Sequence, residues 1–482
     1  MNKIVIIGAN HAGIAAANTI LDNYPENKLV IFDSSSSISY LGCGTALYIG
    51  RQISGTEGLF YTSKENLAAK KATVFMETAV KSIDFDKKEV YAKGKDGEEI
   101  TESYDKLILA TGSLPIAPPI KGLETPNVHF VKTFQDGQII DALLDKPEIK
   151  AVAVVGAGYI GVELAEAVKR RGKDVMLFEA AATSLSTYYD EWFTGDMDKV
   201  LADNGVQLHF GELVQEIEGT QTQHGDAVWM GKATQCSPNE GNGKAETGGF
   251  ALANPAGGNA VKGIVTNKAK YPADAVIMAI GFKPNTTLGN NILETLPNGA
   301  YKVDCEQRTS MKDVFAVGDC ASVRYNATQS DAYIALATNA VRSGIIAGHN
   351  ACGTALESPG VQGSNGICIF GYKMVSTGLN TSAAEKSGYM PECAQFEDLQ
   401  KPAFIKEDNH KVKLRIVYDK NTRRILGAQM ASFQDMSMGI HLFSLAIEEK
   451  LTIDKFKLLD IFFLPHFNQP YNYITMAALS AK

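Results

Sequence analysis

The sequence predicts an α/β protein with two Rossmann-like domains, followed by an α+β domain at the C-terminal end. Two stretches carry the first part of this prediction, "KIVIIGANHAGIAAAN" from Lys3 and "AVAVVGAGYIGVELAEAV" from Ala151. Each combines a β-branched run, a glycine turn and an alanine-rich helical segment. After about residue 326 the pattern changes, and "HKVKLRIVYDKNTRRILGAQMAS" alternates like an antiparallel hairpin around Asn421. A chain of 482 residues is also too long for one core.

Composition narrows the functional classes. Hydrophobic residues make up 45% of the chain, charged residues 21%, and the net charge is -8, which argues against nucleic acid or an anionic membrane as a partner. No apolar run approaches the roughly 20 residues of a membrane span. The apolar part of the N-terminus is only "IVII", so a secretory signal is not expected. Seven cysteines without CxxC or zinc-type spacing predict free thiols, no metal site and a reducing, cytoplasmic location.

The first glycine turn predicts a dinucleotide site. Gly8 permits a sharp turn and Gly13 permits close packing of helix on strand, while Asn10 replaces the middle glycine of the G-x-G-x-x-G pattern. Asp33 ends the next strand, "KLVIFD", twenty residues after Gly13. A carboxylate there can accept hydrogen bonds from a ribose hydroxyl, while the helix N-terminus holds pyrophosphate.

The second turn is complete, with Gly156, Gly158 and Gly161 between a strand and a helix. Glu179 ends the following strand, eighteen residues after Gly161. Its carboxylate repels a 2′-phosphate, and no Arg or Lys follows in "EAAATSLST", so the sequence favours NAD(H) over NADP(H).

Two further strand-turns flank the second Rossmann unit. "YDKLILATGS" ends in Thr111-Gly112, and "MKDVFAVGDCA" ends in Gly318-Asp319. Together with the two glycine turns, they resemble the FAD-binding elements of the two-dinucleotide flavoprotein disulfide reductases. This resemblance implies a glutathione-reductase-like fold with bound FAD, in which Asp319 holds the ribityl chain.

The same resemblance implies a domain order and a set of contacts. Residues 1–120 and 283–325 are expected to form the FAD domain, and 121–282 the NAD domain with a polar insertion at about 220–262. Residues 326–482 are expected to form a dimerisation domain whose last segment reaches the flavin site of the partner in a homodimer. The expected FAD contacts are Gly8, Asn10, His11, Gly13, Asp33, Cys43, Ala110, Thr111, Gly112, Ser113, Lys132, Asp319 and Ala337. The expected NADH contacts are Gly156, Gly158, Tyr159, Ile160, Gly161, Glu179, Tyr188 and Gly281.

The stretch "SYLGCGTALYIG" indicates which redox reactions the protein can catalyse. Cys43 lies between two glycines, and Tyr48 stands where a C-x4-C pair has its second thiol. A lone thiol beside a flavin can form a charge-transfer thiolate, cycle through sulfenic acid, or form a mixed disulfide with a small thiol such as coenzyme A. Each requires a thiolate of lowered pKa, and we expect a helix that begins at Cys43 to provide it.

This stretch resembles the single-cysteine subfamily of NADH oxidases, NADH peroxidases and CoA-disulfide reductases. By resemblance, His11 is a catalytic acid/base near Cys43, and Tyr159 covers the flavin until NADH displaces it. The leading hypothesis is reduction of O2 to water by NADH, with Cys43 cycling between thiolate and sulfenic acid. Reduction of H2O2 by NADH, reduction of a CoA disulfide or persulfide, and a non-enzymatic redox sensor are the alternatives.

Overall fold

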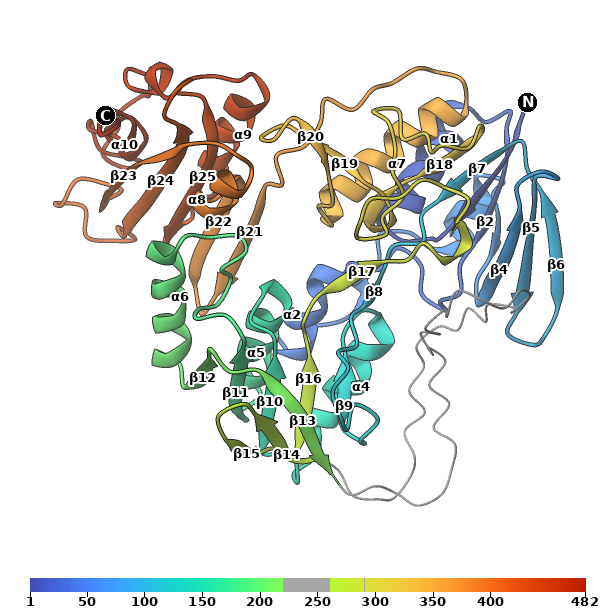
Figure 1. The fold of residues 1–482 in the computed structure, drawn as a ribbon, viewed down its shortest axis with the longest axis horizontal. Helices are drawn as coiled ribbons and strands as arrows, with labels where there is room; N and C mark the ends of the chain where they lie inside the picture. Colours follow the sequence, from blue (N-terminus) through green and yellow to red (C-terminus); the bar gives the residue numbers. More distant parts are fainter. Residues whose placement is uncertain (220–260, 290) are drawn as a thin grey trace.

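The computed structural model describes residues 1–219, 261–289 and 291–482, and shows three regions built on separate sheets (Figure 1). The predicted insertion at about 220–262 lies almost entirely outside the described residues. The α/β class with two parallel sheets and a C-terminal α+β region confirms the predicted fold class.

The first sheet combines two distant parts of the chain. Its strand order is β18-β7-β1-β2-β3, and every neighbouring pair is parallel. Helices α1 and α7 pack so closely that a Cβ added at Gly344 would overlap the Ala12 carbonyl oxygen. The elements are β1 (Lys3–Ile7), α1 (His11–Asn23), β2 (Lys28–Phe32), α2 (Thr45–Ile49), α3 (Lys64–Ala69), β3 (Thr73–Phe75), β7 (Lys106–Leu109), β18 (Val314–Ala316) and α7 (Ala337–Ala351).

The second sheet repeats this plan within one continuous part of the chain. Its order is β12-β11-β10-β16-β9, again with every neighbouring pair parallel. One face of the sheet and its helices form a core rich in Val, Leu and Ala side chains, which also takes in residues of α2 and of the C-terminal sheet. The elements are β9 (Val128–Phe130), α4 (Phe134–Asp145), β10 (Ala151–Val155), α5 (Tyr159–Arg170), β11 (Asp174–Glu179), α6 (Glu191–Asp203), β12 (Val206–Phe210) and β16 (Ala275–Met278).

The C-terminal region is an antiparallel sheet of order β21-β22-β25-β24-β23 with helices packed on it. The hairpin predicted around Asn421 is confirmed, since β24 and β25 pair antiparallel on either side of it. The elements are β21 (Asn365–Ile369), β22 (Tyr372–Gly378), α8 (Thr381–Lys386), β23 (Pro391–Leu399), β24 (Lys411–Asp419), β25 (Ile425–Ser432), α9 (Ile440–Glu448) and α10 (Tyr473–Leu479).

Small sheets join and flank these regions. The pair β8–β17 lies where the chain passes from the first sheet to the second and back (Figure 1). These elements are β4 (Thr78–Asp84), β5 (Glu89–Gly94), β6 (Glu99–Ser103), β8 (Ser113–Pro115), β13 (Val214–Gly219), β14 (Val261–Thr266), β15 (Lys270–Pro272), β17 (Phe282–Pro284), β19 (Val323–Tyr325) and β20 (Ser330–Ala332).

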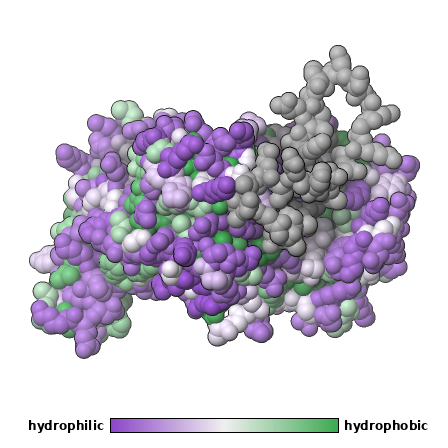
Figure 2. Space-filling view, turned by 90° about the horizontal axis from the view of Figure 1, so that it is seen from below, coloured by the Kyte–Doolittle hydropathy of each residue, from purple (hydrophilic) through white to green (hydrophobic). Residues whose placement is uncertain are grey.

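The surface is mixed in character. The face in Figure 2 is mainly hydrophilic, with hydrophobic side chains in small groups between the charged ones. None of the helices among the described residues has the length and apolar character needed to cross a membrane.

Candidate active site

The two glycine turns share one backbone geometry. Gly8 and Gly156 have φ angles of 112° and 101°, in the left-handed region that disfavours a side chain. A Cβ at Gly13 would overlap the carbonyl oxygen of Gly8, and a Cβ at Gly161 would overlap that of Gly156. The first and last glycines of each turn are therefore required by close backbone packing.

The middle position of the turn is different. A Cβ added at Gly158 would meet no atom within 4 Å. Asn10 occupies the corresponding place in the first turn, where it is exposed and begins α1 without a capping side-chain hydrogen bond. The substitution of Asn for Gly therefore leaves the geometry of the first turn intact.

An acidic residue at the end of β2, and another at the end of β11, accepts hydrogen bonds from the glycine turn of the same sheet. Asp33 accepts hydrogen bonds from the Ala9 and Ser35 amides at 2.5 and 2.7 Å. Glu179 accepts in the same way from the Ala157 and Ala181 amides, at 2.8 and 2.9 Å. Desolvation by burial raises the pKa of Asp33, although its two backbone hydrogen bonds oppose this shift.

The helices behind both turns begin without a cap. Neither α1 nor α5 has a capping side chain or an acidic residue in its first turn. Side chains cap the helices α3, α4, α8 and α10, through Ser63, Thr133, Asn380 and Asn472, whereas α2, α6, α7 and α9 also begin without a capping side-chain hydrogen bond. The free N–H groups and positive dipole ends of α1 and α5 suit a pyrophosphate at each turn.

A polar group lies where the two parts of the first sheet meet. Ser113 donates to Asp319 Oδ2 at 2.8 Å, and Lys132 Nζ donates to Ser113 Oγ at 2.8 Å and lies 3.4 Å from Asp319. Tyr333 lies near Ser113 and Asp319, and burial raises the pKa of its hydroxyl. Thr111 donates to the Asn285 carbonyl at 2.6 Å and so ties this group to the returning chain. These residues fit the hydroxyl-bearing ribityl chain of FAD, because they present a carboxylate, an ammonium and hydroxyl groups.

Cys43 is exposed and lies in a short 3₁₀ turn, Gly42–Gly44. Helix α2 begins two residues after Cys43, at Thr45, and spans only Thr45–Ile49, so the predicted helix start at Cys43 is wrong. Desolvation raises the pKa of the Cys43 thiol, and the Glu163 carboxylate raises it further, while Lys132 lowers it. The expected lowering of this pKa is therefore contradicted, because burial and the Glu163 carboxylate outweigh the effect of Lys132, and a five-residue helix provides little dipole.

His11 belongs to the same electrostatic group. Its ring lies parallel to the Tyr61 ring, with centroids 5.9 Å apart, and the Tyr61 hydroxyl lies 3.3 Å from its Nδ1. Desolvation lowers the pKa of His11, with Asp319 raising it and Lys132 lowering it by smaller amounts. His11 and Cys43 thus share Asp319 and Lys132 as their charged neighbours.

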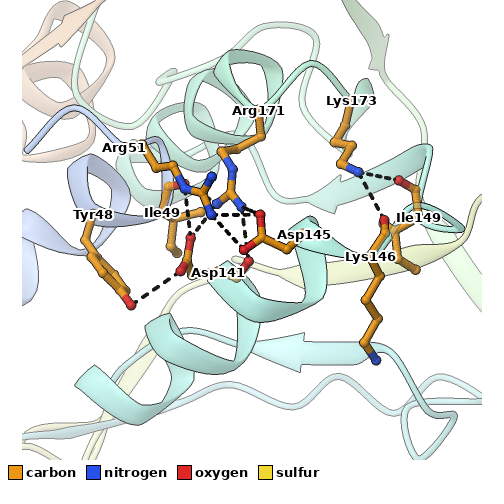
Figure 3. A network of polar contacts seen from close by, with 9 residues as sticks. All are labelled: Tyr48, Ile49, Arg51, Asp141, Asp145, Lys146, Ile149, Arg171 and Lys173. Carbon is orange, nitrogen blue, oxygen red and sulfur yellow. Dashed lines mark hydrogen bonds and ion pairs between the residues drawn. The ribbon is translucent and has the colours of Figure 1, made fainter.

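Tyr48, in place of a second thiol, turns toward α4. Its hydroxyl lies 3.5 Å from Asp141 Oδ2, and its ring packs against that of Phe134. Arg171, only 5% exposed, donates to the Ile49 carbonyl at the end of α2 and to Asp141 Oδ1, at 2.8 and 2.5 Å (Figure 3). The short helix after Cys43 is therefore clamped to α4 and to the chain just beyond α5.

The remaining predicted contacts lie around the two turns. Ala110 packs beside Gly8 and Gly13, and Ala337 is the first residue of α7. Gly281 accepts from the Ile116 amide at 3.0 Å, and Ile160 packs on the core of the second sheet. The Tyr188 ring meets the Tyr159 ring edge-on, with centroids 4.6 Å apart.

Sequence reasoning missed several residues that the fold brings to this region. Glu163 lies one helical turn after Tyr159. Burial, and to a smaller extent the nearby Glu166 carboxylate, raise the pKa of Glu163 to about 7. Its spacing from Tyr159 was a usable signal, because residues four apart share one face of a helix. Tyr61, Tyr333 and Asn365 carried no such signal, because their partners are distant in sequence.

Comparison with known proteins agrees with this geometry. Residues 2–344 match the model of the pyridine nucleotide-disulphide oxidoreductases, and residues 365–472 match the dimerisation domain of the same proteins. The chain belongs to the pyridine nucleotide-disulphide oxidoreductase family. The family is FAD-dependent and uses pyridine nucleotides, which agrees with the two glycine turns.

Several relatives of this oxidoreductase are similar over their full length. The NADH oxidase of Lactococcus lactis subsp. cremoris (strain MG1363) is 53% identical over 481 residues, with 100% of both chains covered. The NADH oxidase of Streptococcus pyogenes serotype M6 is 52% identical over 494 residues, also with 100% of both covered. The solved structure of a water-forming NADH oxidase from Lactobacillus brevis bound to NADH matches with a TM-score of 0.88 and 35% identity, covering 100% of this chain and 98% of that one.

Proposed function

We propose that this chain is a FAD-dependent NADH oxidase that reduces O2 to water, with Cys43 as the peroxide-reducing residue. One observation carries this proposal: Cys43 is exposed, has Tyr48 in place of a second thiol, and belongs to a chain with two dinucleotide turns. The names of the relatives and of the solved structure support it.

Each cofactor has a distinct set of residues. For FAD these are the Gly8–Gly13 turn with Asn10 and His11, then Asp33, the strand end Ala110–Ser113, Lys132, Asp319 and the start of α7 at Ala337. For NADH these are the Gly156–Gly161 turn, Glu179, Tyr159, Tyr188 and Gly281. Glu179 favours NADH over NADPH, because a carboxylate bound to the turn amides repels a 2′-phosphate. When bound, FAD accepts hydride from NADH and supplies the electrons that reduce O2 to peroxide.

Cys43 and His11 then handle the peroxide. The Cys43 thiolate attacks one peroxide oxygen, the O–O bond breaks, and Cys43 becomes sulfenic acid while the other oxygen leaves as hydroxide and is protonated to water. His11, neutral at pH 7 because its pKa is lowered, accepts the thiol proton and returns it to the leaving oxygen. Two electrons from a second NADH and one proton then reduce the sulfenic acid to thiolate and a second water. Two NADH and two protons are consumed per O2.

The surroundings of this site support three further parts of the proposal. Residues 1–120 with 283–325 act as the FAD domain, 121–282 as the NAD domain, and 326–482 as the dimerisation domain of a homodimer. The C-terminal region exposes a group of large apolar side chains that a partner subunit would cover. They are Phe433, Met438, Leu442, Leu445, Leu458, Phe462, Phe463, Leu464, Phe467 and Tyr471. We also propose a cytoplasmic location, because the described cysteines are all free.

Stoichiometry tests the proposed reaction. NADH and O2 consumption are measured together, with and without catalase. We expect two NADH per O2 and no effect of catalase. Absence of O2 uptake until peroxide is added would indicate a peroxidase instead, and NADH oxidation only with CoA disulfide would indicate a disulfide reductase.

Substitution of the cysteine separates the two halves of the reaction. Cys43→Ser is expected to oxidise NADH with O2 and to release about one H2O2 per O2, since the peroxide-reducing thiol is gone. A Cys43→Ser variant that still forms only water would disprove the role of Cys43.

A further inference from the structure

Cys43 lies in a turn that has few side chains of its own. The turn is Gly42–Gly44, so both chain neighbours of Cys43 are glycines. Glycine has no side chain to pack and has more backbone freedom than any other residue. The Cys43 side chain itself is exposed. The conformation of this turn must therefore be fixed by groups outside it.

The Thr45 side chain closes the turn. Thr45 is the first residue of α2, and it is only 4% exposed. Its backbone N–H donates to the Gly42 carbonyl, which is the closing hydrogen bond of a 3₁₀ turn. Its Oγ1 hydroxyl donates to the same carbonyl oxygen at 2.6 Å. Thr45 thus spans Cys43 with two hydrogen bonds to one acceptor.

Tyr40 supplies the next group in this arrangement. Its hydroxyl lies 2.5 Å from Thr45 Oγ1 in the protein interior. A carbonyl oxygen can only accept, so the single hydroxyl proton of Thr45 is directed to Gly42, and Tyr40 is the donor to Thr45. The result is a directed chain of hydrogen bonds from Tyr40 through Thr45 to the residue before Cys43.

The Tyr40 ring is itself held in place. It is 4% exposed and packs against the rings of Phe60 and Phe134, with centroids 5.7 and 5.5 Å away. Phe134 is the first residue of α4, beside the second sheet. Burial raises the pKa of the Tyr40 hydroxyl, so this hydroxyl stays protonated and able to donate. The chain of hydrogen bonds therefore begins at a fixed donor.

The two branches of the Thr45 side chain have different neighbours. The methyl group faces Gly137 of α4, where an added Cβ would lie 3.1 Å from it. The hydroxyl makes the two hydrogen bonds to Tyr40 and Gly42. The methyl group thus serves the packing of α2 on α4, whereas the hydroxyl acts on the turn that carries Cys43.

We propose that Tyr40 and Thr45 position Cys43 to capture peroxide, and that they act through the Thr45 hydroxyl. This inference rests on the proposed function and adds to it two positioning residues. Peroxide formed during turnover either reacts with Cys43 or escapes to solvent. Because a displacement of about 1 Å can slow a reaction roughly 100-fold, a loosened turn should let more peroxide escape.

Two substitutions at Thr45 separate positioning from packing. Thr45→Val keeps the methyl group and removes the hydroxyl, so we expect the H2O2 released per O2 consumed to rise roughly tenfold. Thr45→Ser keeps the hydroxyl and removes the methyl group, and its release should stay within about twofold of the wild type. A role in packing alone predicts the opposite order, because Ser loses the contact with Gly137. Release from Thr45→Val at the wild-type level, or below that of Thr45→Ser, would overturn the proposal.

Tyr40→Phe tests the start of the chain. It removes the donor to Thr45 but leaves the hydrogen bond from Thr45 to Gly42, so we expect a smaller rise in H2O2 release, roughly two- to threefold. The double variant with Thr45→Val should release no more than Thr45→Val alone, because both changes act through one hydroxyl. If Thr45→Val does not fold, Tyr40→Phe decides, and wild-type release from it would overturn the proposal.

Tyr24→Phe is the matched control. Its hydroxyl also makes a hydrogen-bond contact, 2.7 Å from His349 Nδ1, at the end of α1 that lies away from the first glycine turn. We expect Tyr24→Phe to leave the H2O2 released per O2 unchanged. A rise as large as that of Tyr40→Phe would overturn the proposal, because any lost tyrosine hydroxyl would then have the same effect.

Alkylation of Cys43 tests the turn without turnover. The FAD-loaded proteins are treated with iodoacetamide at neutral pH, and the Cys43 peptide is followed by mass spectrometry, since other cysteines are also exposed. Burial raises the pKa of Cys43, so a thiol released from the turn should react faster, roughly two- to fivefold, in Thr45→Val but not in Thr45→Ser. Equal rates in the wild type and Thr45→Val would overturn the proposal. Equal H2O2 release from the wild type and Cys43→Ser would refute the proposed function, and the alkylation rates would still decide whether Thr45 positions the turn.

Discussion

The two glycine turns have the same backbone but different surroundings. The first lies under α7, with Ala12 against Gly318 and Gly344, and its acid Asp33 is desolvated. The second is followed by Tyr159, whose ring packs against Tyr188 of the same region and whose hydroxyl contacts Tyr189 and, in the C-terminal region, Asn365. One sequence motif therefore suits a retained dinucleotide in one place and an exchanged dinucleotide in the other. The packing around the motif, and not the motif itself, makes the difference.

We expect the largest loss of stability when the contact between α2 of the first region and α4 of the second region is removed. Arg171→Met removes the buried cation that joins α2 to Asp141 and Asp145 of α4, and leaves these carboxylates with only the exposed Arg51 as a cationic partner. We expect the free energy of unfolding to fall by about 2–3 kcal/mol, as measured by denaturant titration of the FAD-loaded protein. The control is Arg51→Met, which pairs with the same aspartates but is 56% exposed, and which should cost only about 0–1 kcal/mol. Equal losses from the two variants would show that burial of Arg171 does not join the regions.

The next test places the same methyl group in each turn. Gly13→Ala and Gly161→Ala each drive a Cβ into a carbonyl oxygen of their own turn, and each should cost about 1–3 kcal/mol. Gly13→Ala should lose FAD during purification, whereas Gly161→Ala should keep FAD and bind NAD+ weakly. Flavin absorbance relative to protein measures the first effect and calorimetric titration the second. Loss of FAD from both variants would contradict this difference between the turns, because it would show that the second turn also affects FAD binding.

The pH dependence of peroxide release tests how the second region influences the first. Burial raises the pKa of Cys43 above its usual value, and Glu163 of α5 raises it further, so the thiol form predominates at neutral pH. Below that pKa the thiolate fraction grows about tenfold per pH unit, so the share of O2 released as H2O2 should fall as pH rises. Glu163→Gln removes the negative charge that opposes the thiolate, and its curve should shift to lower pH. A release that is independent of pH in both proteins would contradict a rate-limiting thiolate.

The smallest effect is expected at the middle position of the turn. Asn10→Gly restores the glycine pattern of the second turn at an exposed helix start that makes no capping hydrogen bond. We expect the free energy of unfolding to change by no more than about 0.5 kcal/mol and the FAD content to stay the same. A loss of FAD from this variant would show that the Asn10 side chain holds the cofactor, and would make the two turns less alike than their backbones suggest.

Most features with a local cause can be predicted from the sequence. Both turns, their acids at strand ends and the hairpin around Asn421 follow from residue type and spacing. The start of α2 was misplaced, because the segment after Cys43 forms a 3₁₀ turn before the helix. The raised pKa of Cys43 could not be predicted, because it depends on burial in the folded protein and then on Glu163, which lies on a helix of the other region.

The sequence by itself determined the class of protein, through two dinucleotide turns and through Cys43, which has Tyr48 in place of a second cysteine five residues later. These are short-range patterns, in which glycine conformation, strand ends and residue spacing carry the information. Only the tertiary structure decided which side chains meet across the regions. The Tyr159 hydroxyl meets Asn365 from 206 residues away, and Arg171 meets Ile49 from 122 residues away. Such contacts depend on how separately folded sheets pack together, and no local pattern in the chain encodes that packing.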